Sequence, residues 1–487
     1  MMIDPRLLVV LIAPLVAIVV ALASRRARVA EWANLLAAIA VFIAALSLPF
    51  VAASPRTFAA GYLFLDELGA WVLLCVAVVY LLASLHAVGY MRSDPTHDRR
   101  LPQFYALFAA FALTMLFAPL VANLGVYWIA IELTTLVSTF LVGFERRATS
   151  MEAAWKYIII VSAGISLALL GTIVLYWGGS LVLGPTYDLT WQSLAAVAPR
   201  MNPMLLRLGF LLMLIGYAVK VGLAPMHSWL PDAHSEAPAP VSAMLSGALL
   251  NTAMLGIVRT LAATDAAAAG TMPHAALIVL GVLSILIGAL FIVRQRDIKR
   301  LMAYSSVEHM GIIALGFGFG GVFGVAGALY QMLNHSLNKS LLFFGAGNVM
   351  RRYGTTKIGE IRDVLSQFPV SGPLWLMGAI AITGAPPFGP FLGELSVLRA
   401  GWSGICLWAS ATMLIALIVI FIGFLNHFRV MYFGEPLSDP PTGIRTPAIS
   451  ILPMWIAAIA LLVFGLWWPQ SLRGLFGNIA ASLGATP

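Results

Sequence analysis

Ionisable side chains interrupt several apolar stretches of this sequence that are long enough to cross a bilayer. Each charged group at the centre of a membrane costs at least about 2.5–3.5 kcal/mol, so such residues are retained by pairing, by internal water or by both. Their default interpretation is a hydrated ion pathway. The residues concerned are Glu132, Lys220, Glu308, His309, His335, Lys339 and Glu394.

These side-chain types favour proton exchange over other chemistries. Desolvated carboxyl, amine and imidazole groups can gain and lose protons at physiological pH, and a row of them can relay protons. Sodium would favour a compact cage of carboxylate and carbonyl oxygens. A central lysine argues against such a cage, so the sequence favours protons as the transported ion.

Structural alternatives remain open for individual residues. Glu132 and Lys220 could form a static buried pair, since apolar replacement of such pairs is often no worse for stability. His335 alone could be a hydrogen-bonded core histidine, but Lys339 lies one helical turn further on the same face. Adjacent helical residues point in different directions, so we expect only one of Glu308 and His309, namely His309, to face the pathway.

Further histidines lie near the ends of the apolar stretches. His227, Asp232 and His234 follow a break in one such stretch, where helix capping or packing is as consistent with the pattern as proton uptake. We expect the remaining histidines at the membrane interface, because each falls near a predicted span end. They are His86, His97, His274 and His427.

The overall composition excludes a water-soluble domain. Hydrophobic residues make up 61% and charged residues 10% of the chain, against about 45–50% and about 25% in soluble domains. Cys75 and Cys406 each lie inside an apolar run, so no iron–sulfur cluster, zinc site or disulfide framework is expected. No phosphate-binding loop, dinucleotide fingerprint or HExxH motif occurs. The sequence therefore predicts no cofactor, no metal and no catalytic centre of its own.

The hydropathy pattern predicts an all-α polytopic membrane protein with about 14 transmembrane helices. Most of the 28 lysines and arginines fall in loops after odd-numbered spans, which places those loops in the cytoplasm and both termini outside. This distribution also explains the basic charge without a nucleic-acid partner. We expect the first span to be retained rather than cleaved as a signal peptide, and we expect no long C-terminal arm. The predicted spans lie near 4–24, 31–53, 67–91, 103–122, 123–144, 152–178, 204–223, 240–263, 274–293, 298–318, 322–350, 371–399, 404–433 and 447–468.

Glycine and proline interrupt two of these spans in mid-membrane. The breaks lie at Gly216–Pro225 in span 7 and at Ile382–Glu394 in span 12. Broken helices survive at that depth where protein or a water-filled cavity surrounds them, although ordinary proline kinks are an alternative. An offset of five spans inverts orientation, so residues 103–263 and 274–433 are predicted to be inverted five-helix repeats, as in many transporters. Residues 1–102 would add three spans, and residues 447–487 the last span with a short tail.

The residues around these charges resemble a known superfamily. Ala218–Pro238, containing Lys220, is similar to the signature of the antiporter-like membrane subunits of respiratory complex I, Mrp antiporters and membrane-bound hydrogenases. Trp128–Leu133, Asp297–Gly311, His335–Phe344 and Gly393-Glu394 carry the same resemblance, which covers roughly residues 60–435. Ser306–Met310 with Lys339–Asn348 looks most like the component F type of hydrogenase-4.

The resemblance implies a proton-translocating subunit of a hydrogenase-4, formate-hydrogenlyase-like or complex I-like redox complex in a bacterial inner membrane. Glu132 and Lys220 would gate the proton, and His309, His335 and Lys339 would lead it to Glu394. Relatives often carry a lysine where Asn251 stands, and asparagine cannot titrate. The implied partners are other membrane subunits, a peripheral redox module and membrane lipid. An Mrp-type sodium/proton antiporter subunit and a non-pumping membrane scaffold are the alternatives.

Overall fold

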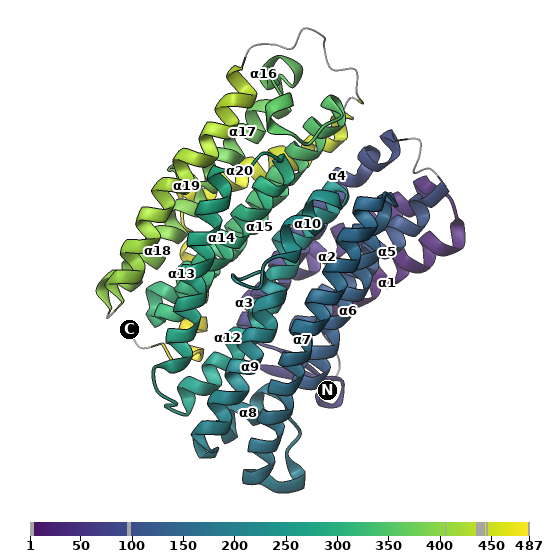
Figure 1. The fold of residues 1–487 in the computed structure, drawn as a ribbon. Coiled ribbons are helices and arrows are strands. Elements are labelled where there is room, and N and C mark those ends of the chain that lie inside the picture. The colour runs from purple at the N-terminus through teal and green to yellow at the C-terminus, as the bar shows by residue number, and fades with distance from the viewer. Residues whose placement is uncertain (1–3, 95–98, 405, 435–443, 445–446, 486–487) are drawn as a thin grey trace.

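The computed structural model describes residues 4–94, 99–404, 406–434, 444 and 447–485. These residues fold almost entirely into α-helices, many of which run roughly side by side (Figure 1). Apolar runs form helices here because lipid offers the backbone no hydrogen-bond partner, so each segment must satisfy its own N–H and C=O groups. Within the described ranges, eleven helices are long and apolar enough to span a membrane.

The first half of the chain contains the helices that hold Glu132 and Lys220. Its elements are α1 (Pro5–Ser24), α2 (Ala27–Leu46), α3 (Leu48–Val51), β1 (Arg56–Phe58), β2 (Leu63–Leu65), α4 (Glu67–Tyr90), α5 (Leu101–Phe117), α6 (Leu124–Val142), α7 (Ala148–Leu183), α8 (Trp191–Val197), α9 (Pro203–Val221), α10 (Trp229–Glu236), α11 (Ala239–Met244) and α12 (Leu250–Ala266). Strands β1 and β2 form a small antiparallel hairpin that the all-α prediction did not include.

The second half contains the helices that hold the remaining ionisable residues. Its elements are α13 (Met272–Val293), α14 (Ile298–Phe319), α15 (Gly321–Tyr353), α16 (Val364–Gln367), α17 (Ser371–Ile382), α18 (Gly389–Ser403), α19 (Leu407–Phe433), α20 (Leu452–Leu466) and α21 (Gln470–Ser482). Predicted spans 10, 11 and 12 correspond to α14, α15 and the α17–α18 pair. These three are not among the eleven helices counted by length and composition, so the total of 14 stays a prediction.

Both predicted helix breaks are confirmed. Helix α9 ends at Val221, where Gly222 takes a left-handed conformation with φ of 78°, and α10 begins at Trp229. Helix α17 ends at Ile382, Gly384 has φ of 67°, and α18 begins at Gly389. Glycine fits both turns because it has no Cβ to clash at positive φ.

The helices around each break pack in the same order. Helix α7 packs against α6 and against both halves of the broken span, α9 and α10, and α15 packs against α14 and against both halves of the second broken span, α17 and α18. This matching order is what two repeats require, while their inversion in the membrane stays a prediction. Helix α15 also contacts α4, α11, α17, α20 and α21, so its polar residues lie at the centre of the packed helices.

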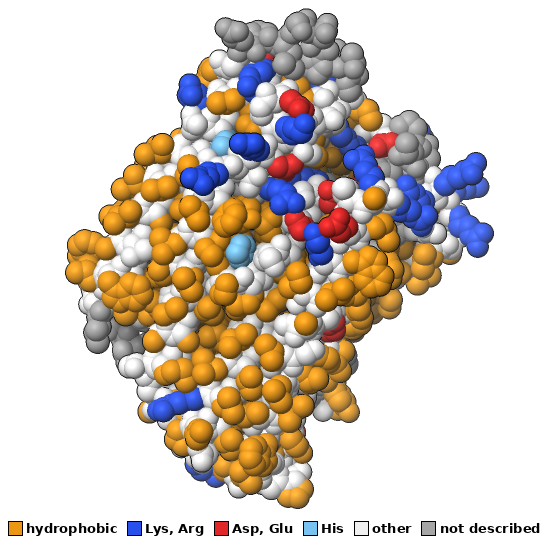
Figure 2. Space-filling model, in the orientation of Figure 1, with side chains coloured by type: hydrophobic (Ala, Val, Ile, Leu, Met, Phe, Trp, Pro, Cys, Tyr) orange, Lys and Arg blue, Asp and Glu red, His pale blue; other side chains and the backbone are white. Residues whose placement is uncertain are grey.

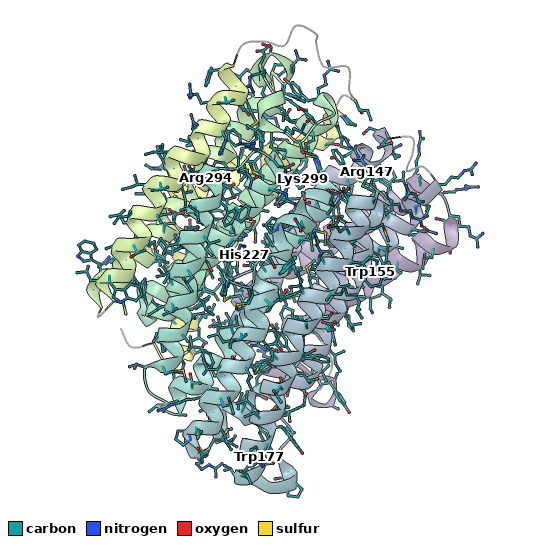
Figure 3. All side chains as sticks on the ribbon, viewed as in Figure 1. Arg147, Trp155, Trp177, His227, Arg294 and Lys299 are labelled. Carbon is teal, nitrogen blue, oxygen red and sulfur yellow. The ribbon has the colours of Figure 1, made fainter. Side chains whose placement is uncertain are left out.

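Charged side chains gather toward one end of the molecule. Figure 2 shows them in the upper part of the visible face, above a surface that is mainly hydrophobic. Arg294, Lys299 and Arg147 lie toward that end, and Trp177 lies toward the other (Figure 3). A hydrophobic belt below a basic end is the surface expected of a membrane protein.

Candidate functional site

Lys220 is held by hydroxyl groups rather than by a carboxylate. It is fully buried in the last turn of α9, directly before the break. Its Nζ donates hydrogen bonds to Thr135 Oγ1 at 2.7 Å and to Tyr157 Oη at 2.9 Å. Tyr157 Oη is also 2.7 Å from Ser138 Oγ. Helices α6, α7 and α9 therefore meet at one ammonium group.

Glu132 lies one turn from this group on α6. Its Oε1 accepts a hydrogen bond from Ser162 Oγ at 2.6 Å, and its Oε2 is buried without a hydrogen-bond partner. Among the described residues, no ion pair within 4.0 Å joins Glu132 to Lys220. Thr135 follows Glu132 by three residues on the same helix face and holds the lysine. Thr135 therefore binds Lys220 and lies one helical turn from Glu132.

Lys339 repeats this arrangement in the second half of the chain. It is fully buried on α15, and its Nζ donates to Met302 O at 3.0 Å and to Ser305 Oγ at 2.5 Å. Ser305 precedes Glu308 by three residues on α14, so it shares a helix face with that glutamate. Each half of the chain thus contains a buried lysine, a hydroxyl that accepts from it, and a glutamate one turn from the hydroxyl.

Glu308, His309 and Glu394 form a buried cluster at the second break. Ligand atoms of these three side chains all lie within 4.8 Å of one another, and Glu308 Oε2 is 3.7 Å from His309 Nε2. Both oxygens of Glu308 are buried without a hydrogen-bond partner. Two buried carboxylates this close are stabilised by a shared proton or a cation. Both Glu308 and His309 reach the cluster, although adjacent helical residues were expected to diverge.

Gln331 connects the histidine of this cluster to the glutamate on α18. Its Nε2 is 2.7 Å from His309 Nδ1 and 3.5 Å from Glu394 Oε1. His309 Nε2 lies 2.9 Å from Ile382 O, the last carbonyl of α17. Because a carbonyl can only accept, the neutral imidazole carries its proton on Nε2 and accepts the glutamine amide at Nδ1. The broken helix thus fixes the orientation of the imidazole.

Glycines at the second break make room for polar side chains. A Cβ atom built at Gly384 would collide with Glu394 Oε2, and one built at Gly393 would collide with Gln331 Oε1. The backbone of this break therefore touches the carboxylate and the amide directly. The glycines in the sequence of span 12 serve this close approach as well as the turn.

His335 extends the row toward the first half of the chain. Its ring centre is 5.5 Å from that of His309, and its Nε2 is 3.3 Å from Ser246 O. Ser246 belongs to a π-helical segment, Leu245–Leu249, between α11 and α12. Asn251, one turn later, donates from Nδ2 to Ser336 Oγ at 3.1 Å. Asn251 is therefore buried beside α15.

The residues after the first break divide into three environments. His234 is fully buried, and neither ring nitrogen has a hydrogen-bond partner among the described residues. The positive charge of Lys339 acts on this ring. Asp232 instead forms ion pairs with Arg300 at 2.5 Å and Lys156 at 3.7 Å, so it belongs to a partly exposed network. His227 packs against aromatic rings near the middle of the molecule (Figure 3).

The histidines near span ends differ in burial, and their place at the membrane interface stays a prediction. His86 is fully buried within the protein, its Nδ1 lies 2.9 Å from Ser450 O, and its ring stacks on Phe344. His274 is 2.8 Å from Asp265 at the start of α13, and His427 Nε2 is 2.7 Å from a backbone carbonyl. His97 lies outside the described residues.

Sequence reasoning missed the neutral members of the site. Thr135, Tyr157, Ser305 and Gln331 carry no charge, so the cost of burying charge did not single them out. Spacing gave a signal for three of them. Thr135 follows Glu132 by three residues, Ser305 precedes Glu308 by three, and Gln331 precedes His335 by four, which places each on the face of an ionisable neighbour.

The fold and the site define a polytopic helical membrane protein with two broken helices and a buried row of ionisable residues between them. Residues 121–424 match the family model described as "NADH:quinone oxidoreductase/Mrp antiporter, TM". The chain therefore belongs to this family.

Individual relatives agree with the family assignment. The chain is 34% identical over 462 residues to a hydrogenase-4 component F homolog of Methylacidiphilum infernorum (isolate V4), covering 94% of this chain and 95% of that protein. It is 30% identical to NADH-quinone oxidoreductase subunit N of Xanthomonas euvesicatoria pv. vesicatoria (strain 85-10), covering 81% and 79%. A chain of the Mrp complex from Dietzia sp. DQ12-45-1b shares the fold, with a TM-score of 0.86, 21% identity and coverage of 99% and 98%.

Proposed function

We propose that this protein is the proton-translocating, antiporter-like subunit of a membrane-bound redox complex of the hydrogenase-4, formate-hydrogenlyase or complex I type. The observation that carries the proposal is the burial of the two central lysines and the kind of hydrogen-bond partner that each one has. Lys220 and Lys339 are fully buried, and each donates to hydroxyl or carbonyl groups with no carboxylate within 4.0 Å in the described chain.

An ammonium group in this environment exchanges its proton more easily than one locked in a contact ion pair. A contact carboxylate would hold the charge in place, because separating a buried pair leaves two uncompensated charges. Hydroxyl groups accept from the ammonium and can equally donate to the neutral amine. The carboxylate one helical turn away stabilises the protonated lysine without forming a contact ion pair with it. This arrangement favours a carrier of protons over a static structural pair.

The contacts suggest an order for the proton carriers. Glu132 and Lys220 form the first group, in which Thr135 binds the lysine one helical turn from the glutamate. Lys339 forms the second, in which Ser305 binds the lysine one helical turn from Glu308 and the cluster at the second break. Among the described residues, no hydrogen bond joins the Lys220 group to the His335 side of the row. Transfer across that interval would need water or side-chain movement, and Asn251 lies at its edge.

The driving reaction would take place in other subunits. The described cysteines are single, Cys75 buried and Cys406 partly buried, and offer no set of iron–sulfur ligands. Electron transfer in a peripheral redox module, joined through other membrane subunits, would supply the energy. The basic end of the molecule would face the bacterial cytoplasm, with both termini on the periplasmic side.

Proton uptake by inverted vesicles of the host membrane, with the native complex in place, tests the proposal. Hydrogen, formate and NADH are offered in turn as electron donors, which also identifies the redox module. Glu132→Gln and Lys220→Ala are each expected to abolish most proton movement while the complex remains assembled on a native gel. Coupled activity at the wild-type rate in both variants would favour a scaffold and refute the proposal.

Sodium/proton exchange is the second candidate, favoured by one observation. The carboxylates of Glu308 and Glu394 lie close together near the last carbonyl of α17, and oxygen-rich sites of this kind suit hard cations. Transport in the same vesicles with and without sodium separates the two candidates. A rate that depends on sodium, and sodium uptake lost in Glu394→Gln, would favour exchange over proton pumping.

A further inference from the structure

A groove on the outer surface of the helices lies outside the buried row. It has a volume of about 480 Å³ and is formed by the start of α5, the end of α6 with its following turn, and the start of α7. Its wall is largely apolar and includes Leu107, Phe140, Trp155 and Ile158. Phe140 is 66% exposed and Trp155 is 63% exposed, so large apolar groups face whatever surrounds the protein at this position.

Two arginines lie at one end of the groove. Arg100 donates from Nη1 to Phe144 O at 2.8 Å, which leaves most of its five N–H donors for other partners. Arg146 lines the groove as well, is exposed, and forms no ion pair with any described residue. Helices α5 and α7 both begin here without a side-chain cap or an acidic residue in the first turn. Unsatisfied N–H groups at helix starts add to the positive potential.

The positive end and the apolar wall follow one another along the axis of α7. Trp155 and Ile158 lie about two to three turns into α7, which at 1.5 Å per residue puts them roughly 10–15 Å below the first residue of that helix. Figure 3 shows Trp155 below Arg147 at the basic end of the molecule. A ligand that fits must carry an anionic group joined to a long apolar chain, with the anion at the level of the lipid headgroups.

We propose that this groove binds one anionic phospholipid, with its phosphate on Arg100 and Arg146 and an acyl chain against Phe140, Trp155 and Ile158. Paired arginines recognise phosphate oxygens, and basic pockets between transmembrane helices at the cytoplasmic side suit acidic headgroups. The bound lipid would join α5, α6 and α7 at their cytoplasmic ends. The inference concerns binding alone and does not depend on proton transport.

Photo-crosslinking in native membranes tests this site. A photoreactive amino acid replaces Phe140 in the full chain, and the adducts are identified by mass spectrometry. The same amino acid at Ile159, which is 61% exposed on α7 and does not line the groove, reports the bulk lipid. We expect the ratio of anionic to zwitterionic lipid adducts at Phe140 to exceed that at Ile159 on the order of 10- to 30-fold, from two arginines acting together.

Charge variants separate this site from unspecific attraction. Arg146→Asn removes the charge and keeps the left-handed backbone, with φ of 56°, that asparagine tolerates. It should reduce the enrichment at Phe140 at least severalfold, and Arg146→Lys should restore most of it. Arg28→Gln, in the first turn of α2 and outside the groove lining, should leave the ratio unchanged. A polypeptide adduct at Phe140, a ratio equal to the bulk value, or enrichment abolished by millimolar inorganic phosphate would each overturn the proposal.

Discussion

Replacing Thr135 by valine removes a hydroxyl that binds Lys220 while keeping the shape of the side chain. The Lys220 ammonium then retains only Tyr157 as a hydrogen-bond acceptor. A hydrogen bond to a charged group contributes about 1.5–3 kcal/mol, so the protonated lysine should lose this amount relative to the neutral amine. If transport passes through the protonated lysine, its rate should fall roughly 10- to 150-fold.

The assay is the initial rate of proton uptake by inverted vesicles that carry the assembled complex. Thr134→Val is the matched control, because Thr134 is equally buried and its hydroxyl donates only to Ile131 O of its own helix at 2.6 Å. Thr135→Ser should restore much of the rate, since it returns the acceptor. Rates within twofold of wild type in Thr135→Val would refute the idea that this hydroxyl holds the lysine charge during transport.

Two further substitutions probe the second break and the stability of the fold. Gly384→Ala adds a methyl group where Glu394 Oε2 lies and strains a backbone with positive φ, so proton uptake should fall at least tenfold. Gly359→Ala is the control and should leave proton uptake unchanged, because the space around its Cα is open. Asp66→Ala removes the cap of α4 and the 2.7 Å partner of the buried Arg259, which should destabilise the fold by roughly 2–4 kcal/mol. The thermal midpoint of the purified protein should therefore fall by several degrees, and an unchanged midpoint would show that this pair does not contribute.

Local rules predicted the elements of this fold because the membrane constrains them strongly. Long apolar runs must form helices in lipid, and glycine–proline clusters such as those after Lys220 and before Glu394 must break them. Both breaks appear in the structure where the sequence placed them. The β1–β2 hairpin was missed because it lies in a short loop between spans, where the hydropathy pattern carries no information on strand pairing.

The sequence by itself determined which residues are costly to bury and therefore need partners. Lys220, Lys339 and Glu394 were identified for this reason alone, since an ionisable group in an apolar run is visible without knowledge of the fold. The family motifs around them added the expectation of a shared row. Neither argument could say what each charge touches.

Tertiary structure alone decided the partners. Thr135 and Ser305 hold the lysines because helices from different parts of the chain cross there, and Asp232 joins a peripheral ion network rather than the buried row. His86 is buried because Ser450, far along the chain, supplies its acceptor. Hydrogen bonds depend on ångström-scale distances between helices, and those distances follow from side-chain packing that periodicity along one helix does not encode.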